Sequence, residues 1–253
     1  MKLFHKEFGS GKPLIILHGL FGFSDNWQSH AKHLSSYYRV ILFDLRNHGR
    51  SPWSDTHNYE VMAADVAESL KGLGVNHGNF IGHSMGGKIL MHLALNDSSY
   101  IDKMIVVDMG IKSYPMHHQD VINAIQSVNL ENITARSQVN EFLKPILSDE
   151  GLRQFLLKNL YWKEKGVLAW RMNIEVLIDR MSDVLSALPA GEVVKETLFI
   201  RGGLSNYILD EDIDAIDNQF LNSNIITIDE AGHWVHSEAP EEFTQSILSF
   251  LLR

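Results

Sequence analysis

The segment Asn79-Phe80-Ile81-Gly82-His83-Ser84-Met85-Gly86-Gly87-Lys88 decides the fold class of this chain. A short apolar stretch, a Gly-x-Ser-x-Gly turn and a further apolar run predict a strand, a sharp turn and a helix. Such a turn needs small residues beside the serine, because its backbone is strained and closely packed. It places the Ser84 hydroxyl at a helix N-terminus, where free amides and the helix dipole stabilise negative charge. We therefore predict that Ser84 is the nucleophile of an acyl transfer.

Short apolar segments bounded by turn residues recur along the chain, as expected of strands buried on both faces of a parallel sheet. They cover residues 14–17, 40–43, 80–81, 104–107, 198–200 and 225–228. Helical patterns lie between them, at 59–73, after Ser84, around Asp210 and from Pro240 onward. This alternation predicts an α/β fold with a doubly wound, mostly parallel sheet flanked by helices.

The alternation stops after residue 109, where helical patterns follow one another at 121–128, 139–147, 152–160 and 174–185. A helical block between two strands predicts a cap over the carboxyl edge of the sheet, where open α/β sheets bind ligands. We expect an α/β-hydrolase core at 1–110 and 190–253, with a helical cap at 111–189 inserted after the strand ending at Asp108. The alternative is that these helices only cover a face of the sheet.

Two backbone amides are the expected donors of an oxyanion hole. The Met85 amide directly follows the nucleophile. The second donor should come from His18-Gly19-Leu20-Phe21-Gly22, which follows the first apolar segment. We assign it to the Leu20 amide, with the Phe21 amide as the alternative. His18 and His83 are interpreted as residues that fix the two turns.

The general base should be a histidine late in the chain, because this fold orders its triad as serine, acid and histidine. His233 follows the apolar segment at 225–228 and precedes the last helix, so we predict that it is the base. His236 is its rival, and we expect it to support the loop or to face solvent. A metal bound by this pair would lack a third ligand at metal-ligand spacing, so we expect no metal and no cofactor.

The acid that orients the histidine has two candidates. Most hydrolases of this fold carry it after the strand that follows the cap, but residues 201–207 contain no carboxylate. Asp210 stands further on, in the first turn of a predicted helix, where a capping role suffices. Asp108 ends an earlier strand at the same edge of the sheet, within reach of His233. We predict Asp108 as the acid, although a structural role, as for Asp44, is the alternative.

The composition excludes several classes of function. A net charge of −9 without a basic patch argues against nucleic-acid binding. The absence of cysteine removes disulfides, thiol catalysis and cysteine-ligated metals. No stretch of about 20 apolar residues is present and the N-terminus lacks a signal-peptide pattern, so we expect a cytoplasmic protein without a membrane span.

The chain resembles the YbfF-type esterases of the α/β-hydrolase superfamily essentially from end to end. The matching stretches are His18-Gly19-Leu20-Phe21-Gly22, Asp44-Leu45-Arg46-Asn47-His48-Gly49, Gly82 to Lys88, Val107-Asp108 and Ala231-Gly232-His233-Trp234-Val235-His236. The resemblance implies a triad of Ser84, His233 and Asp108 that hydrolyses carboxylic esters, with acyl-CoA thioesters as an open alternative. The chain departs from the family at Leu204, where asparagine is usual, and over much of the cap.

The predicted partner is therefore a small ester or thioester. Cofactor-free lyases, carbon–carbon bond hydrolases and acyltransferases use the same triad and remain alternatives, as does a non-catalytic binding module. A haloalkane dehalogenase needs a carboxylate nucleophile, and position 84 is a serine. Large apolar side chains of the cap are candidates for an acyl pocket, with core packing as the alternative. They are Tyr161, Trp162, Trp170, Met172 and Met181.

Overall fold

A seven-stranded sheet forms the centre of the computed structural model, which describes residues 1–116, 118–131 and 133–253. The strand order is β1-β3-β2-β4-β5-β8-β9, and every pairing except β1 with β3 is parallel. The strands are β1 (His5–Phe8), β2 (Pro13–Leu17), β3 (Arg39–Phe43), β4 (Gly78–His83), β5 (Ile101–Val107), β8 (Glu196–Gly202) and β9 (Ser223–Ile228). The predicted mostly parallel α/β sheet is confirmed.

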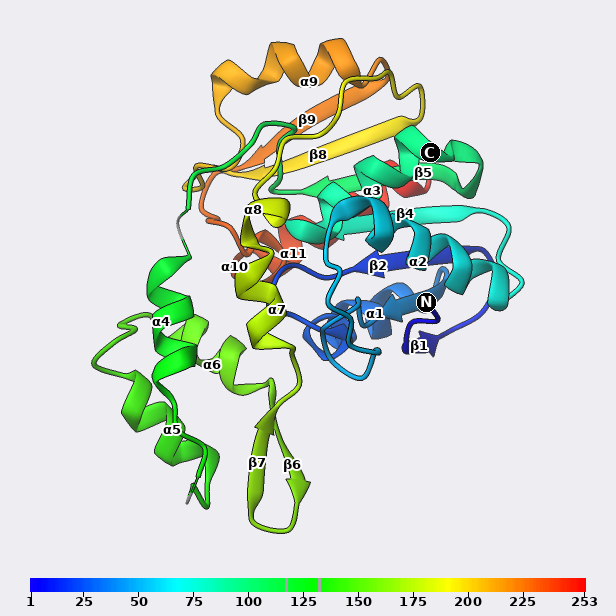
Figure 1. Ribbon diagram of the computed structural model, residues 1–253. Helices are drawn as coiled ribbons and strands as arrows, with labels where there is room; N and C mark the ends of the chain where they lie inside the picture. The colour runs from blue at the N-terminus through cyan, green and yellow to red at the C-terminus, as the bar shows by residue number, and fades with distance from the viewer. Residues whose placement is uncertain (117, 132) are drawn as a thin grey trace.

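Helices cover both faces of this sheet (Figure 1). Alternate residues of β2 show the division, because Leu14 and Ile16 belong to one apolar cluster and Ile15 and Leu17 to another. The first cluster includes residues of α1 (Gln28–Leu34) and α11 (Pro240–Leu251). The second includes residues of α2 (Tyr59–Gly72), α3 (Met85–Asn96) and α9 (Ile213–Gln219). Strands buried on both faces explain the continuous apolar runs of the sequence.

Strand β1 was not predicted from the sequence. It pairs antiparallel with β3 at the edge of the sheet, with His5 opposite Phe43. Its residues His-Lys-Glu-Phe are partly or fully exposed, so they carry no apolar run. Charged, short edge strands of this kind protect a sheet from pairing with another chain.

The segment between β5 and β8 lies beyond the carboxyl ends of the strands (Figure 1). Its elements are α4 (Gln119–Ser127), α5 (Arg136–Leu143), α6 (Glu150–Leu157), β6 (Leu160–Glu164), β7 (Val167–Trp170), α7 (Ile174–Asp179) and α8 (Met181–Val184). The expectation of an all-helical block is wrong here, because β6 and β7 form an antiparallel hairpin. Its turn contains Gly166 at φ +83°, a conformation that glycine adopts without steric cost. The helix predicted to reach residue 160 ends at Leu157, and the one predicted at 174–185 is divided at Arg180.

The two connections between this segment and the sheet lie side by side. The Tyr114 amide donates to the Leu185 carbonyl at 2.9 Å, and the Leu188 amide donates to the Ile111 carbonyl at 2.8 Å. The buried ammonium of Lys88 on α3 holds both connections, since it donates to the carbonyls of Lys112 and Ser186 at 2.8 and 2.7 Å. The helix that begins at the Ser84 turn is thus tied to both ends of the inserted segment.

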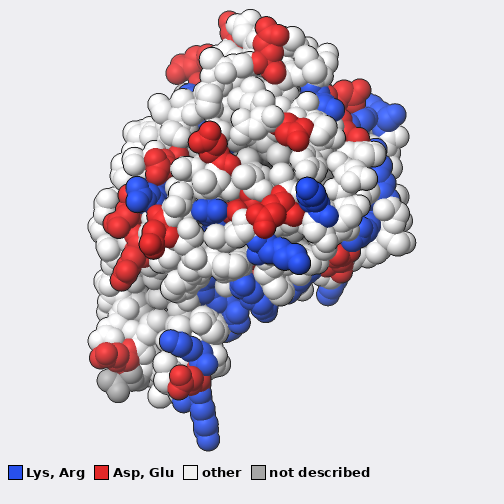
Figure 2. Space-filling model, turned by 45° about the vertical axis from the view of Figure 1, so that its right-hand side comes forward, with Lys and Arg blue, Asp and Glu red and all other residues white. Residues whose placement is uncertain are grey.

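Acidic and basic side chains are interspersed over much of the face in Figure 2, with Lys and Arg more frequent toward its lower edge. Within the described part of the chain, no helix combines the length and apolarity needed to cross a bilayer.

Candidate active site

Ser84 occupies a sharp turn between β4 and α3, as the sequence predicted. Its φ of 52° and ψ of −119° lie outside the regions that non-glycine residues ordinarily adopt. The turn is possible because its neighbours lack side chains. A Cβ atom on Gly82 would lie 2.4 Å from the Gly86 carbonyl oxygen, and one on Gly86 would lie 2.3 Å from the Leu17 carbonyl oxygen. The strained turn thus projects the Ser84 hydroxyl beyond the end of the strand.

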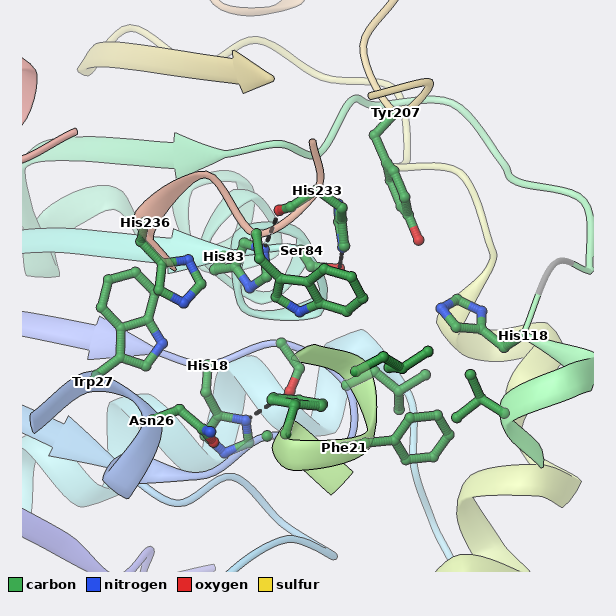
Figure 3. Close-up of a pocket in the computed structure, with 17 residues that line it drawn as sticks. His18, Phe21, Asn26, Trp27, His83, Ser84, His118, Tyr207, His233 and His236 are labelled. Carbon is green, nitrogen blue, oxygen red and sulfur yellow. Dashed lines mark hydrogen bonds between the residues drawn. The ribbon is translucent and has the colours of Figure 1, made fainter. Parts of the chain in front are cut away.

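The structure brings Ser84, His233 and Asp108 into one hydrogen-bonded chain, of which Figure 3 draws the contact between Ser84 and His233. His233 Nε2 lies 3.0 Å from Ser84 Oγ, and His233 Nδ1 lies 2.8 Å from Asp108 Oδ2. Both distances are within hydrogen-bond reach, and the imidazole presents one nitrogen to each partner. This is the geometry that a nucleophile, a base and an orienting acid require.

The Asp108 carboxylate is fully buried at the end of β5, and it accepts hydrogen bonds from the last residue of β8 and from the turn that follows. The Gly202 amide donates to its Oδ1 at 3.0 Å, and the Ser205 hydroxyl donates to its Oδ2. The Asp108 backbone, at φ 47°, is held by its amide, which donates to the Ile200 carbonyl at 2.8 Å. The turn without a carboxylate therefore supplies hydrogen bonds to a carboxylate on the neighbouring strand.

Asp210, the alternative acid, lies elsewhere. Its side chain is 87 % exposed and forms an ion pair with Arg201 Nη1 at 2.6 Å. The capping role expected of it falls to Asp212, whose Oδ2 accepts the Leu209 amide at 2.8 Å. The structure thus joins Asp108, and not Asp210, to His233.

Two side chains, Glu238 and His83, hold the loop that carries His233. The sequence predicted this role for neither of them. Glu238 accepts the amides on both sides of the histidine, from Gly232 at 2.6 Å and Trp234 at 3.1 Å. His83 Nε2 donates to the His233 carbonyl at 2.9 Å, so His83 fixes this loop as well as its own turn. The acid five residues after the histidine is a signal that could have identified Glu238.

Tyr207 packs against the other face of the site. Its ring stacks on the His233 imidazole, with centroids 3.9 Å apart and planes 15° from parallel. The Tyr207 carbonyl accepts the hydroxyl of Tyr114 at 2.8 Å. No sequence pattern identified Tyr207, because stacking depends on the path of the loop after β8.

The Leu20 amide, which is the expected second oxyanion donor, differs from the alternative Phe21 amide in its hydrogen bonding. The Phe21 amide donates to His48 Nε2 at 3.2 Å and is therefore already occupied. Among the described residues, no acceptor is found for the Leu20 amide. Met85 opens α3, where amides lack a partner within the helix. Leu20 and Met85 remain our predicted donors.

Burial keeps several histidines of the site neutral. Loss of solvent lowers the pKa of His18 to about 4 and the pKa of His83 to about 3. It likewise lowers the pKa of His48 to about 3 and holds that of His236 well below its ordinary value. The His236 ring stacks on Trp27 at 4.2 Å, consistent with the loop-supporting role expected of it. In the described ranges, no three metal-binding side chains gather into a possible metal site.

A cavity of about 250 Å³ opens beside Ser84. The inserted segment covers it with Val121 of α4, Leu152 and Phe155 of α6, and His118 (Figure 3). The five large cap side chains considered from the sequence do not belong to its described lining. The apolar core buries three of them, Trp170, Met172 and Met181. Tyr161 packs under the Arg171 guanidinium, and Trp162 is 45 % exposed.

Comparison with known proteins identifies the family of this chain. A family model described as the alpha/beta hydrolase fold matches residues 12–240. The chain belongs to the α/β-hydrolase family. This α/β-hydrolase is 35% identical to the esterase YbfF of Escherichia coli, over 96% of this chain and 94% of that protein, which confirms the resemblance. It is 35% identical to the sn-1-specific diacylglycerol lipase ABHD11 of Danio rerio, over 96% of this chain and 79% of that protein. A marine microorganism esterase of known structure is 38% identical, with a TM-score of 0.96 and 99% of each chain covered.

Replacing Asp108 by asparagine tests the acid. Asparagine removes the negative charge that faces His233 Nδ1, so we expect kcat for an ester to fall by about 10⁴. Asp210→Asn is the matched control, and its kcat should stay within a few-fold of the wild type. Ser205→Asp should partly restore activity to Asp108→Asn, because Ser205 contacts the same carboxylate oxygen as His233. A large loss in Asp210→Asn with full activity in Asp108→Asn would contradict the assignment.

Glu238→Gln tests the loop anchor. Glutamine offers one acceptor oxygen where the carboxylate offers two, so one of the two flanking amides loses its partner. We expect kcat to fall about 3- to 10-fold, as a lost hydrogen bond of about 1 kcal/mol implies, with KM within twofold. Steady-state kinetics measure both constants. Glu241→Gln, an exposed neighbour on α11, is the control, and an unchanged kcat in Glu238→Gln would argue against the anchor.

The neutral histidines predict how stability depends on pH. Their pKa values are lowered in the native state, so the unfolded chain binds protons first as the pH falls below about 6.5. The stabilisation is complete above that pH and is lost toward pH 4, by up to about 1.4 kcal/mol per pH unit for each histidine. Urea unfolding at pH 7.5, 6 and 5 measures this slope. His48→Gln should reduce it, and His77→Gln, whose side chain is 63% exposed, should not. A free energy of unfolding that stays constant over this range would contradict the prediction.

Proposed function

We propose that the protein is a serine carboxylester hydrolase that works through an acyl-enzyme on Ser84. The observation that carries the proposal is the hydrogen-bonded chain from Ser84 through His233 to Asp108, beside a cavity large enough for a small ester. The printed names of the related proteins, an esterase and a lipase, support the same reaction class. In this proposal residues 111–189 act as the cap of a core formed by 1–110 and 190–253.

In the first step His233 Nε2 takes the proton of the Ser84 hydroxyl while Ser84 Oγ attacks the ester carbonyl carbon. The carbonyl oxygen becomes negatively charged and accepts hydrogen bonds from the Leu20 and Met85 amides. The tetrahedral intermediate collapses when the carbon–oxygen bond of the leaving alcohol breaks. The imidazolium of His233 returns its proton to that alcohol, which leaves an acyl group on Ser84.

In the second step water repeats the attack on the acyl-enzyme. His233 takes one proton of the water, the hydroxide oxygen bonds to the acyl carbon, and the proton then passes to Ser84 Oγ as the acid departs. Asp108 holds the imidazole in the tautomer that accepts at Nε2 and stabilises the imidazolium that forms in each step.

Other reactions share this machinery and are separated by substrate. An acyltransferase would pass the acyl group to an alcohol in preference to water, and a carbon–carbon bond hydrolase would cleave a 1,3-diketone. A screen of simple esters, thioesters and 1,3-diketones, with and without added alcohol, distinguishes these activities. Acyl-CoA thioesters stay the alternative substrate class that the family resemblance implies, and the same screen tests them.

Labelling with a fluorophosphonate tests the nucleophile directly. The reagent phosphonylates an activated serine, so the wild type should gain one adduct, mapped to the Ser84 peptide by mass spectrometry. Ser84→Ala should gain none and should lose turnover of a chromogenic ester. Ser249→Ala, which removes an exposed hydroxyl on α11, serves as a control that retains the nucleophile and the label. Turnover retained in Ser84→Ala would contradict the proposed function.

A further inference from the structure

An aromatic ring lies parallel to the imidazole of His233. Tyr207, in the loop after β8, stacks on it with ring centroids 3.9 Å apart and planes 15° from parallel (Figure 3). The His233 side chain is 19 % exposed, so the ring of Tyr207 stands where water would otherwise cover this face of the imidazole. The reaction proposed above converts the imidazole into an imidazolium in each step. The Tyr207 ring therefore lies where a positive charge forms.

Two hydrogen bonds hold the backbone of Tyr207 in this position. Its amide donates to Ser205 Oγ at 3.3 Å, and its carbonyl accepts the hydroxyl of Tyr114 at 2.8 Å. The Ser205 hydroxyl in turn donates to the Asp108 carboxylate. The Tyr114 hydroxyl accepts the amide of Gly110, shortly after Asp108, at 2.8 Å. The aromatic ring and the carboxylate that contact the imidazole are thus held to each other as one unit.

The face of the Tyr207 ring carries a negative electrostatic potential, as the faces of all phenol rings do. It attracts a cation that lies over it within about 6 Å of the centroid, and more strongly where water is excluded. A neutral imidazole gains only the stacking contact, whereas an imidazolium gains the stacking contact and the cation–π attraction. Because the imidazolium forms on the way to the transition state, this difference lowers the barrier instead of only strengthening the resting arrangement.

The titratable neighbours of His233 differ in charge. Asp108 supplies a negative charge at Nδ1. His83, with its ring centroid 4.9 Å away, and His236 are buried, and loss of solvent lowers the pKa of both, so they stay neutral. Burial and the charge of Asp108 raise the pKa of the Tyr207 phenol, so its ring also stays uncharged. The imidazolium thus meets a carboxylate at Nδ1 and a neutral aromatic ring over its face.

We propose that Tyr207 is a positioning residue whose aromatic face stabilises the imidazolium form of His233 during acyl transfer. The inference rests on the proposed function, since it assigns a further residue to that reaction. It follows from the parallel stacking, the largely buried imidazole and the hydrogen bonds that join the Tyr207 backbone to the segment of Asp108.

Stepwise fluorination of the ring at position 207 tests the inference. Tyr207→Phe keeps the aromatic face, and phenylalanines with two or three ring fluorines have nearly the same shape but a less negative face. We expect kcat/KM for p-nitrophenyl acetate to stay within about fivefold of the wild type in Tyr207→Phe. It should then fall with each fluorine, by at least about threefold for 3,4,5-trifluorophenylalanine relative to Tyr207→Phe.

The pH dependence separates the stabilisation of a charge from packing. The acid limb of the kcat/KM profile reports protonation of the base in the free enzyme. A ring that stabilises the imidazolium favours protonation, so a less negative ring should move the midpoint of this limb to lower pH. We expect a shift of about 0.5 pH unit for the trifluoro residue, which matches the threefold loss because one imidazolium accounts for both. A packing role alone leaves the midpoint unchanged.

The same trifluoro residue at position 142 is the matched control. Phe142 is 46 % exposed on α5 and lies outside the described lining of the cavity, so its replacement should leave kcat/KM and the midpoint as in the wild type. Tyr207→Leu replaces the series if the fluorinated chain does not fold, as judged by circular dichroism. It has no aromatic face, so kcat/KM should fall about tenfold and the midpoint should move to lower pH.

Three outcomes would count against these expectations. Loss of activity in Tyr207→Phe would overturn the inference, because it would assign the role to the hydroxyl. A kcat/KM and a midpoint that do not respond to fluorination, or in its place to Tyr207→Leu, would overturn the inference alone. A wild type that hydrolyses no ester would overturn the proposed function and this inference with it.

Discussion

The hydrogen bond between Asp108 and His233 is the interaction on which the rest of the site depends. It joins the end of β5 to a loop 125 positions further along the chain, so both must be held by the sheet and its turns. The carboxylate is fully buried, and burial of a charge is tolerated only with several hydrogen bonds. Gly202, at the end of β8, and Ser205, in the turn that follows, meet that requirement. The position of the acid after β5 and the donors of this segment therefore depend on each other, because the buried carboxylate needs those hydrogen bonds.

The His233 loop is also held in place by hydrogen bonds and packing, and it borders the cavity beside Ser84. Glu238, His83 and Tyr207 fix the His233 loop through its flanking amides, its carbonyl and its ring. Burial keeps the neighbouring histidines neutral, so the lining adds no fixed charge beside the nucleophile. In an uncharged, partly enclosed space, the Asp108 carboxylate and the two predicted oxyanion amides act with little screening by water. The cavity beside Ser84 is thus an environment that strengthens the catalytic electrostatics.

The sequence predicted the parts of this protein that local patterns encode. Continuous apolar runs identified the inner strands, and the Gly-x-Ser-x-Gly motif identified the turn at Ser84. Strand β1 was missed because an exposed edge strand has no apolar run. The β6–β7 hairpin was missed because most of β6 is exposed and β7 has only four residues, so neither strand carries a continuous apolar run. The cavity lining could not be predicted, since it depends on how α4 and α6 pack over the sheet. Tyr207 acts through a tertiary contact that no spacing rule describes.

Proton NMR of the imidazole tests whether His233 is hydrogen-bonded to Asp108 in solution. A histidine Nδ1 proton in a short hydrogen bond to a buried carboxylate resonates far downfield, clear of the amide protons. We expect such a resonance in the wild type and in Asp210→Asn, assigned to His233 by its loss in His233→Gln. We expect it to be lost in Asp108→Asn. A downfield His233 resonance that survives in Asp108→Asn and disappears in Asp210→Asn would contradict this expectation.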